Sequence, residues 1–260
     1  MTVYKQYDTR WGSKLYPSKP STVASSGCGL VAVTHCVIEQ DKYSHYTPLN
    51  CYSFMKQYAV RGHGTQWEGI RKGLEHWGYK VHEPNISKSM ESAWSELNKG
   101  NRIGVLLLKA GSRNGVTWTG SGHYVAFTGY KVENGKHYFY TKDSGGRNHT
   151  GWYQYEKYIQ GLLPKIWIVE RVKENIPAIK KTKGYTGKLP SKTIKKGSTG
   201  TSVKNWQLFL RWAFDTTKLK AGGGFRDVTE KYTIYFQKQT GLVPDGIVGP
   251  KTLAKAKTFK

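Results

Sequence analysis

The stretch SSGCGL, residues 25–30, opens the first strongly patterned segment of the chain. Apolar residues continue from Leu30 at helical spacing, so the sequence predicts a helix over about residues 28–40, with Ser26 as its cap. Cys28 then lies in the first turn, where the helix dipole and unpaired backbone N–H groups favour a thiolate. These are properties of a nucleophilic cysteine. A buried core cysteine beside a glycine turn is the alternative.

Composition indicates the broad class of the protein. The chain has 260 residues, of which 37% are hydrophobic and 13% aromatic, which suits a globular protein with two domains. No window is apolar over the length that a membrane helix needs, and the first residues lack the apolar core of a signal peptide. We therefore expect no signal peptide and no stable membrane insertion.

The net charge of +24 is densest in the last third of the chain. Residues 173–260 contain 19 Lys and Arg but only 5 Asp and Glu. This surplus predicts a polyanionic partner, which charge alone leaves open between nucleic acid, an anionic membrane and a cell wall rich in phosphate and carboxylate. Because no nucleic-acid-binding motif is present, we expect no nucleic-acid partner.

The three cysteines do not suggest a disulfide framework. An odd number cannot pair completely, and Cys28 and Cys36 on one helix would be roughly 12 Å apart, too far to bridge. The spacing of Cys28, Cys36 and Cys51 also lacks a zinc signature. We expect reduced thiols, no metal site and no cofactor, with Cys36 and Cys51 in the core.

Helical patterns come first and strand patterns follow. This order predicts an α+β domain over residues 1–172, with an antiparallel sheet after the helices. The turn at residues 133–136 predicts a hairpin between two of the strands. The expected helices cover about residues 28–40, 48–58, 67–77 and 87–97, and the expected strands cover about residues 103–108, 124–130, 137–140 and 166–169.

The rest of the chain predicts a linker and a small helical domain. Residues 173–192 are rich in lysine and poor in apolar periodicity, so we expect a basic linker. Residues 193–260 contain three amphipathic patterns, at about 203–214, at about 228–239 and from Pro250 onward. These patterns predict an all-α domain of three helices.

A cysteine nucleophile needs a base, and the base needs an orienting group. His123 follows a glycine loop at the expected start of a strand, and Asp143 ends the partner strand of the hairpin. The hairpin brings these two ends together, so the two side chains can be neighbours. Gln6 could donate to an oxyanion together with the Cys28 N–H. Taken one at a time, the alternatives are a core or rim histidine, a turn aspartate and an ordinary surface glutamine.

The N-terminal portion resembles papain-like cysteine peptidase domains of the bacteriocin-leader-peptidase type. The matching pieces are QYDTRW at residues 6–11, SGCG at residues 26–29, GHYV at residues 122–125, and Asp143. The family often shows Asp-Pro where this chain has Asp-Ser. The resemblance implies four catalytic roles: Cys28 as nucleophile, His123 as base, Asp143 as orienting group and Gln6 as oxyanion donor. Gly27 and Gly122, the small neighbours of the cysteine and the histidine, are expected to border the substrate.

The C-terminal portion resembles a peptidoglycan-binding domain of the three-helix type. The matches include KGSTG at residues 196–200 and the run GLVPDGIVGPKT at residues 241–252. The resemblance implies binding of wall glycan, with Trp206 and Asp245 as expected substrate-binding residues. The family's usual first Asp-Gly turn is missing here, and AGGGFRD at residues 221–227 stands in its place.

Together the two resemblances imply a peptidoglycan hydrolase similar to bacteriophage endolysins. Such an enzyme would be a monomer that binds peptidoglycan and anionic wall polymers, is made in the host cytoplasm, and cuts an amide bond of the wall peptide. Two other functions stay open. One is an N-acetylmuramoyl-L-alanine amidase that uses the same triad, and the other is a non-catalytic wall-binding protein.

Overall fold

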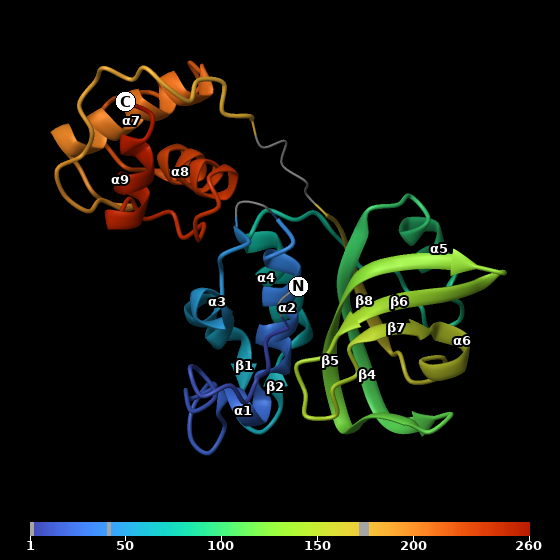
Figure 1. Ribbon diagram of the computed structural model, residues 1–260. Helices are drawn as coiled ribbons and strands as arrows, with labels where there is room; N and C mark the ends of the chain where they lie inside the picture. Colours follow the sequence, from blue (N-terminus) through green and yellow to red (C-terminus); the bar gives the residue numbers. More distant parts are fainter. Residues whose placement is uncertain (1–2, 41–42, 172–176) are drawn as a thin grey trace. The chain divides into compact units, whose positions relative to one another are not determined.

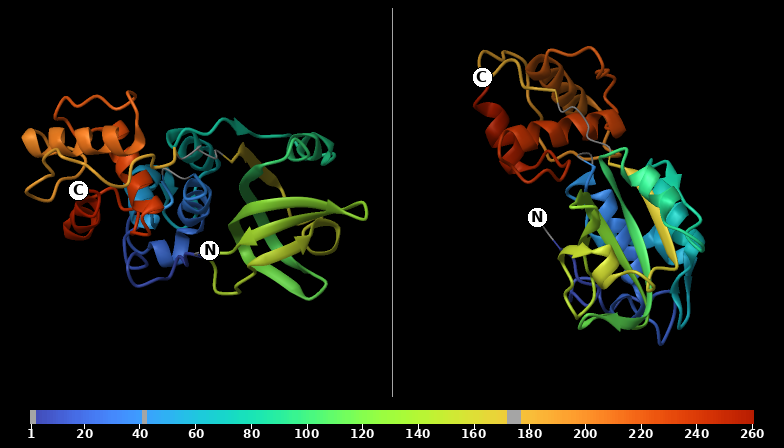
Figure 2. Two further views of the ribbon diagram at one scale, coloured as in Figure 1. Left: turned by 45° about the horizontal axis from the view of Figure 1, so that its top comes forward. Right: turned by 90° about the vertical axis from the view of Figure 1, so that its right-hand side faces the viewer.

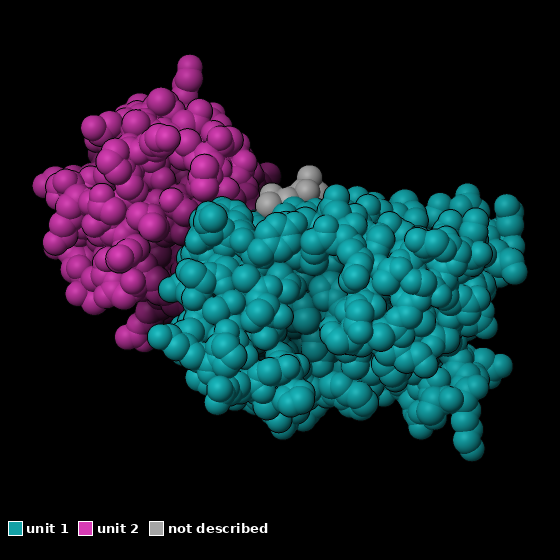
Figure 3. Space-filling view, turned by 90° about the horizontal axis from the view of Figure 1, so that it is seen from below, with its two compact units in different colours: residues 1–173 teal, residues 174–260 magenta. Residues whose placement is uncertain are grey.

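The computed structural model describes residues 3–40, 43–171 and 177–260. The chain divides into two compact units, distinguished by colour in Figure 3: unit 1 contains residues 1–173 and unit 2 contains residues 174–260. Unit 1 begins with helices and continues into an antiparallel sheet, and the later part of unit 2 is helical (Figure 1). The predicted α+β class with a helical C-terminal domain is confirmed.

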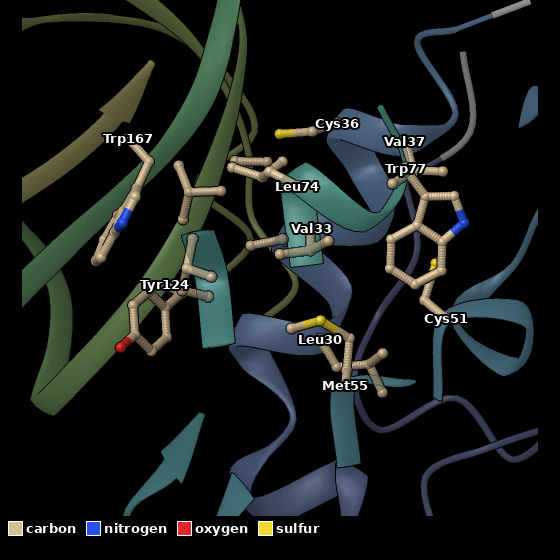
Figure 4. Packing of buried hydrophobic residues seen from close by; sticks show 14 of the residues in the cluster. Leu30, Val33, Cys36, Val37, Cys51, Met55, Leu74, Trp77, Tyr124 and Trp167 are labelled. Carbon is tan, nitrogen blue, oxygen red and sulfur yellow. The ribbon is translucent and has the colours of Figure 1, made fainter. Parts of the chain in front are cut away.

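The helical half of unit 1 is built around α2, Cys28–Val37. Nine of its ten residues are buried, because apolar side chains cover the helix all round. Figure 4 shows Leu30 and Val33 of α2 near Met55 and Leu74, which belong to the same core cluster. The other elements of this half are α1 (Val23–Ser26), α3 (Pro48–Met55), the 3₁₀ helix η2 (Lys56–Tyr58), β1 (Ala59–Val60), β2 (Gly64–Thr65) and α4 (Trp67–His76).

The larger described sheet has the strand order β3-β8-β4-β5-β6-β7, and every neighbouring pair is antiparallel. Its last strand in sequence, β8, lies between β3 and β4. The α2 helix lies along one face of the sheet, and α5 and α6 lie at the other side (Figure 1, Figure 2). The elements of this half are β3 (Val81–His82), α5 (Glu91–Leu97), β4 (Arg102–Arg113), β5 (Val116–Glu133), β6 (Lys136–Lys142), β7 (Gly151–Gln154), α6 (Tyr155–Tyr158) and β8 (Lys165–Glu170).

Both faces of the central strands are covered. Tyr124 and Ala126 of β5 join the core cluster on the α2 side, together with Trp167 (Figure 4). Val125 and Phe127 join the cluster on the other face, since successive residues of a strand point to opposite sides. This double covering explains why the predicted strand at residues 103–108 is apolar throughout rather than alternating.

The predicted hairpin between β5 and β6 is present. Its turn consists of Asn134 and Gly135, both with positive φ (51° and 69°), which suits a two-residue turn between twisted strands. Because the register pairs Ala126 with Lys142, the chain leaves β6 beside the part of β5 that holds His123.

A buried cluster of charges lies at the end of β6. Lys142 Nζ is 2.8 Å from Glu39 Oε1, and Arg171 Nη2 is 3.1 Å from Glu39 Oε2. The Lys142 side chain is fully buried, so its charge depends on the Glu39 partner. This cluster ties the segment after α2 to the residue that directly precedes Asp143.

Unit 2 packs α7 (Thr201–Phe214), α8 (Asp227–Gln239) and α9 (Pro250–Lys257) around one apolar core. These helices lie within two residues of the predicted starts and ends. The core is aromatic-rich, with Trp206, Phe209 and Phe236 among its fully buried members. In the part of the chain that the structure describes, no helix is long and apolar enough to cross a membrane.

Four details differ from the sequence predictions. The helix expected over about residues 87–97 begins only at Glu91. Ser26 is the last residue of α1, and Gly27 is the residue that caps α2, without a side-chain hydrogen bond. Residues 120–122 lie within the long strand β5 rather than in a loop before it. The described part of the predicted linker, residues 177–192, belongs to unit 2, where Tyr185 is buried and its N–H donates to Phe259 O at 2.9 Å. Residues 173–176 lie outside the described residues.

Candidate active site

Cys28 is the first residue of α2 and is half-buried. The short helix α1 ends at Ser26, and Gly27 alone separates it from α2. A Cβ on Gly27 would lie 2.5 Å from Val23 O, so only glycine lets the two helices meet this closely. The predicted role of Gly27 beside the substrate stays a prediction, because its visible function is to permit this contact.

The structure brings the predicted base and orienting group together. His123 Nε2 lies 2.7 Å from Asp143 Oδ1, and both side chains are buried. His123 also lowers the pKa of Cys28, so the same imidazole lies next to the sulfur. Because Nε2 faces Asp143, the ring presents Nδ1 to the sulfur. Cys28, His123 and Asp143 therefore form one Cys-His-Asp row. They come from the start of α2, the middle of β5 and the position directly after β6.

Asp143 accepts several hydrogen bonds. Besides His123, its carboxylate accepts from Gly145 N at 2.7 Å and from His149 N at 2.9 Å. Burial alone would raise the pKa of Asp143, but the hydrogen bond and charge of His123 and these backbone N–H groups hold the pKa well below its usual range. Asp143 is therefore an anion fixed in position at neutral pH.

The charges of the row favour a thiolate beside an imidazolium. Burial opposes the charge on His123, but bonds to Asp143 and Cys28 outweigh it and raise the pKa of His123 to about 10. Burial likewise opposes ionisation of Cys28, but the hydrogen bond and charge of His123 and the backbone N–H groups of Tyr124 and Gly29 leave its pKa below the usual value. A stabilised thiolate is the reactive form of a cysteine nucleophile.

The other two cysteines have the opposite environment. Cys36 and Cys51 are fully buried. Burial raises the pKa of Cys51 to about 12, and burial, with the charge of Glu39, raises the pKa of Cys36 far above its usual value. Both residues are core cysteines, as the sequence predicted.

Gln6 connects the two sides of the site. Its Nε2 donates to Ala24 O at 2.7 Å, its backbone N–H donates to Ser144 O at 3.1 Å, and Ser144 Oγ donates to its Oε1 at 3.3 Å. A carboxamide has two N–H hydrogens, so the bond to Ala24 leaves the other for a further acceptor. The oxyanion role of Gln6 stays a prediction.

Lys5 was missed by sequence reasoning. Its Nζ donates to Asp143 O at 2.7 Å, to Gly145 O at 3.4 Å and to Asn148 Oδ1 at 2.7 Å. The lysine therefore fastens the loop that follows β6, on which Asp143 sits. No local pattern distinguishes this lysine from the 40 other basic residues of the chain, because its partners are more than 130 residues away.

Two glycines border the Cys-His-Asp row. A Cβ on Gly145 would lie 3.1 Å from both Asp143 Oδ1 and His123 Nε2, so a side chain there would press on the pair. Gly122 is exposed, and a Cβ there would meet nothing within 4 Å. The open space at Gly122 agrees with its predicted place beside the substrate, which remains a prediction.

A hydroxyl network lies beneath the first turn of α2, which holds Cys28. Tyr124 OH donates to Thr65 O at 2.9 Å, and Tyr16 OH lies 2.9 Å from Thr65 Oγ1. A Cβ on Gly29, next to Cys28, would lie 2.5 Å from the same Thr65 Oγ1, so β2 packs directly under the first turn of α2. Sequence reasoning did not predict this support, because Tyr16, Thr65 and Tyr124 come from three separate segments.

The two residues proposed for glycan binding in unit 2 have structural roles. The prediction for Trp206 is wrong: its side chain is fully buried, and its Nε1–H donates to Thr233 Oγ1 at 2.8 Å. The apolar face of α7 is needed for the core, so the indole is not available to a ligand. Asp245 is exposed, but its Oδ1 accepts from Ile247 N and Gln237 Nε2, both at 2.8 Å, and closes a turn.

Within the described residues, no group of three or more His, Cys, Asp or Glu side chains is arranged to hold a metal ion. The acidic and imidazole groups of the site are instead paired with one another, as His123 and Asp143 are.

Comparison with protein families gives one match, over residues 199–255, to the family described as "Putative peptidoglycan binding domain". The three helices of unit 2 are therefore similar to this family. The match covers α7, α8 and most of α9, and it includes both the run at residues 241–252 and the divergent run at residues 221–227. No curated protein matches the chain.

Among solved structures, the chain is similar to a "putative C39-like peptidase from Bacillus anthracis", with 13% identity and a TM-score of 0.35 over 57% of this chain and 90% of that one. It is also similar to a periplasmic domain of the EpsAB fusion protein of the Vibrio vulnificus type II secretion system, with 15% identity and a TM-score of 0.25 over 70% of this chain. That alignment spans 65% of the Vibrio chain, just under two thirds of its length. Likenesses at these scores say nothing about the reaction of this chain.

Proposed function

We propose that the protein is a cell-wall hydrolase that cleaves an amide bond of peptidoglycan with a Cys28-His123-Asp143 triad. The observation that carries this proposal is the row itself: His123 Nε2 lies 2.7 Å from Asp143 Oδ1, and the same ring lowers the pKa of Cys28. Nucleophile, base and orienting group are the parts that acyl transfer through a thiol requires. The peptidoglycan-binding domain supplies the substrate class.

The reaction follows from the charges of the row. The Cys28 thiolate attacks the amide carbonyl carbon, and the carbonyl oxygen becomes an oxyanion near the Cys28 N–H and the Gln6 amide. The imidazolium of His123 gives its Nδ1 proton to the leaving amine, and the C–N bond breaks to leave a thioester. Water then attacks the thioester while His123 takes one of its protons. Release of the acid product regenerates the thiolate and the imidazolium.

Asp143 acts on the imidazole alone. Its carboxylate, held by Gly145 N and His149 N, fixes the ring orientation and stabilises the positive charge that His123 carries. Unit 2 would hold the enzyme on the wall and raise the local concentration of substrate. In a lytic phage protein of the endolysin type, this combination would open the wall of the host from inside.

The bond that is cut can be identified from the products. We would incubate the full chain with purified walls and analyse the soluble fragments by mass spectrometry, with Cys28→Ala as the inactive control. A new free amine on a stem or bridge residue means endopeptidase activity, and a lactyl group freed of its peptide means amidase activity. Equal fragment release by the wild type and by Cys28→Ala would contradict the proposed hydrolase.

A further inference from the structure

Unit 2 contains two turns of the same construction, each held by a buried glutamine. At the first turn, Gln207 Oε1 accepts from Gly223 N, and Gln207 Nε2 donates to Gly224 O and to Thr229 Oγ1, all at 2.9 Å. Gln207 is 2% exposed, so these bonds complete its hydrogen-bonding needs inside the protein.

At the second turn, Gln237 repeats the pattern. Its Oε1 accepts from Gly246 N at 2.9 Å, and its Nε2 donates to Ile247 O at 2.9 Å and to Thr252 Oγ1 at 3.1 Å. The two turn glycines also share a left-handed backbone, with φ of 77° at Gly223 and 73° at Gly246. The two turns therefore correspond residue by residue in their hydrogen bonds, and in this correspondence Gly222 matches Asp245.

The two turns differ at this position. The Asp245 carboxylate accepts from Ile247 N at 2.8 Å and so closes the second turn. Gly222 has no side chain, and a Cβ on it would meet nothing within 4 Å. Among the described residues, no acceptor reaches the N–H of Gly224, which corresponds to that of Ile247. The first turn therefore has an open place where the second holds a carboxylate oxygen.

The open place lies in a groove of about 800 Å³. Its walls come from the start of α7, the segment before the first turn and the start of α8. Four exposed cations line it, and within the described residues none of the four pairs with a carboxylate. The nearby acids Asp227 and Glu230 are paired with Lys196, at 2.6 and 3.1 Å. The four cations are Lys204, Lys218, Lys220 and Arg226.

We propose that this groove binds a linear polyphosphodiester of the cell wall, with one phosphate oxygen in the place that Asp245 Oδ1 fills in the second turn. The Gly224 N–H would donate to that oxygen. Lys218, Lys220 and the other lining cations would pair with that phosphate and its neighbours along the polymer. Within the described residues these four cations have no carboxylate partner. A ligand with several negative charges therefore matches them better than a ligand with a single carboxylate does. This inference rests on the proposed wall-binding role and names the polymer that unit 2 takes.

The main test compares two double variants of equal charge. In a Cys28→Ala background, which prevents lysis, we would measure binding of the full chain to poly(glycerol phosphate) by calorimetry at fixed salt. Lys218→Gln/Lys220→Gln should weaken binding about tenfold, since both charges line the groove. Lys257→Gln/Lys260→Gln removes the same charge from exposed sites outside the groove, and a change below about twofold is expected. Equal losses in both double variants would overturn the proposal.

A single substitution tests the open place. Gly222→Asp would supply the missing carboxylate, and Gly222→Ala would supply only the added bulk. The groove model predicts that Gly222→Asp binds poly(glycerol phosphate) at least about tenfold more weakly than Gly222→Ala, because the new carboxylate takes the Gly224 N–H and repels phosphate. Equal affinities of the two variants would contradict the assigned oxygen position.

Two further arms separate this inference from the proposed function. In one arm, binding is measured to walls stripped of phosphate polymers. In the other arm, poly-glutamate, whose charges are carboxylates, takes the place of poly(glycerol phosphate). If the wild type binds poly-glutamate as tightly as poly(glycerol phosphate), the choice of phosphodiester is wrong, although unit 2 still binds walls. If it binds neither intact nor stripped walls, the wall-binding role itself fails. Cleavage of a soluble wall peptide by the groove variants, with Cys28 present, reports separately on the catalytic row.

Discussion

Unit 1 and unit 2 both bury polar side chains, but around Cys28 these groups are charged, whereas at the turns of unit 2 they are neutral amides. In unit 1, the Asp143 anion holds an imidazolium that faces a half-buried sulfur. In unit 2, the amides of Gln207 and Gln237 bond to backbone and threonine groups of their own turns, and Gln237 also donates to the Asp245 carboxylate.

The contrast separates two uses of a buried hydrogen bond. A satisfied amide fixes the shape of a turn and presents the surface that the turn carries. A charged pair that ends at an accessible atom changes the reactivity of that atom, because its charge is not cancelled within the network. Substitutions of a satisfied amide should therefore change stability, and substitutions of the charged pair should change the rate of cleavage.

The largest effect is expected at the sulfur. Cys28→Ala removes the nucleophile and should lower kcat for a soluble wall peptide by about 10⁴-fold or more, with little change in melting temperature. Cys51→Ala is the matched control: the same atom is lost from a core position, so the melting temperature should fall while kcat is kept. Loss of kcat in Cys51→Ala at a temperature where it is fully folded would break the comparison.

The second effect compares the same chemical change in both units. Asp143→Asn keeps the shape of the side chain but removes the charge that holds His123, and kcat should fall by about 10³-fold. Asp245→Asn alters only a turn, so kcat on a soluble peptide should stay within about twofold. An unchanged rate in Asp143→Asn would mean that another group orients His123. The measurements are steady-state rates, with circular dichroism to confirm folding.

These contrasts also show how much of the fold and of the candidate site could be predicted from the sequence. The long helical patterns, the Asn-Gly hairpin and the residues of the catalytic row carry local signals, and the structure places Cys28, His123 and Asp143 side by side. Trp206 was misassigned because an exposed stacking residue and a core residue look alike on an amphipathic helix. Lys5 and Thr65 gave no signal, because their contacts with the site depend on segments that meet only in the folded chain.

The third effect is on stability. Gln237→Leu leaves Gly246 N and Ile247 O without their partner inside unit 2, and unmet buried polar groups should lower the free energy of unfolding by about 3 kcal/mol. Peptide cleavage by folded protein should not change. Urea unfolding followed by fluorescence gives the free energy. A loss of kcat at zero urea would show that the turns of unit 2 contribute to the chemistry of unit 1.

The smallest effect is the pH dependence. The raised pKa of His123, about 10, means that the imidazolium persists through neutral pH, and kcat/KM should fall about tenfold per unit only above pH 10. The same shift stabilises the fold: its contribution is complete below the unfolded pKa of about 6.5 and is lost as pH rises from there to about 10. Asp245→Asn should leave both profiles unchanged. An alkaline fall in kcat/KM that begins near pH 7 would contradict the ion pair.

The place of β8 in the sheet has a consequence for how unit 1 folds during synthesis. Because this strand is the last of unit 1 to leave the ribosome yet lies between β3 and β4, the nascent chain cannot complete its sheet until residue 170 has emerged. Pairings between distant segments also form slowly. Cys28 is made 142 residues earlier than Glu170, so during that part of synthesis the completed sheet is not yet present beside it. On the proposed mechanism, Cys28 gains its base and orienting group only after the strands that carry His123 and Asp143 have folded.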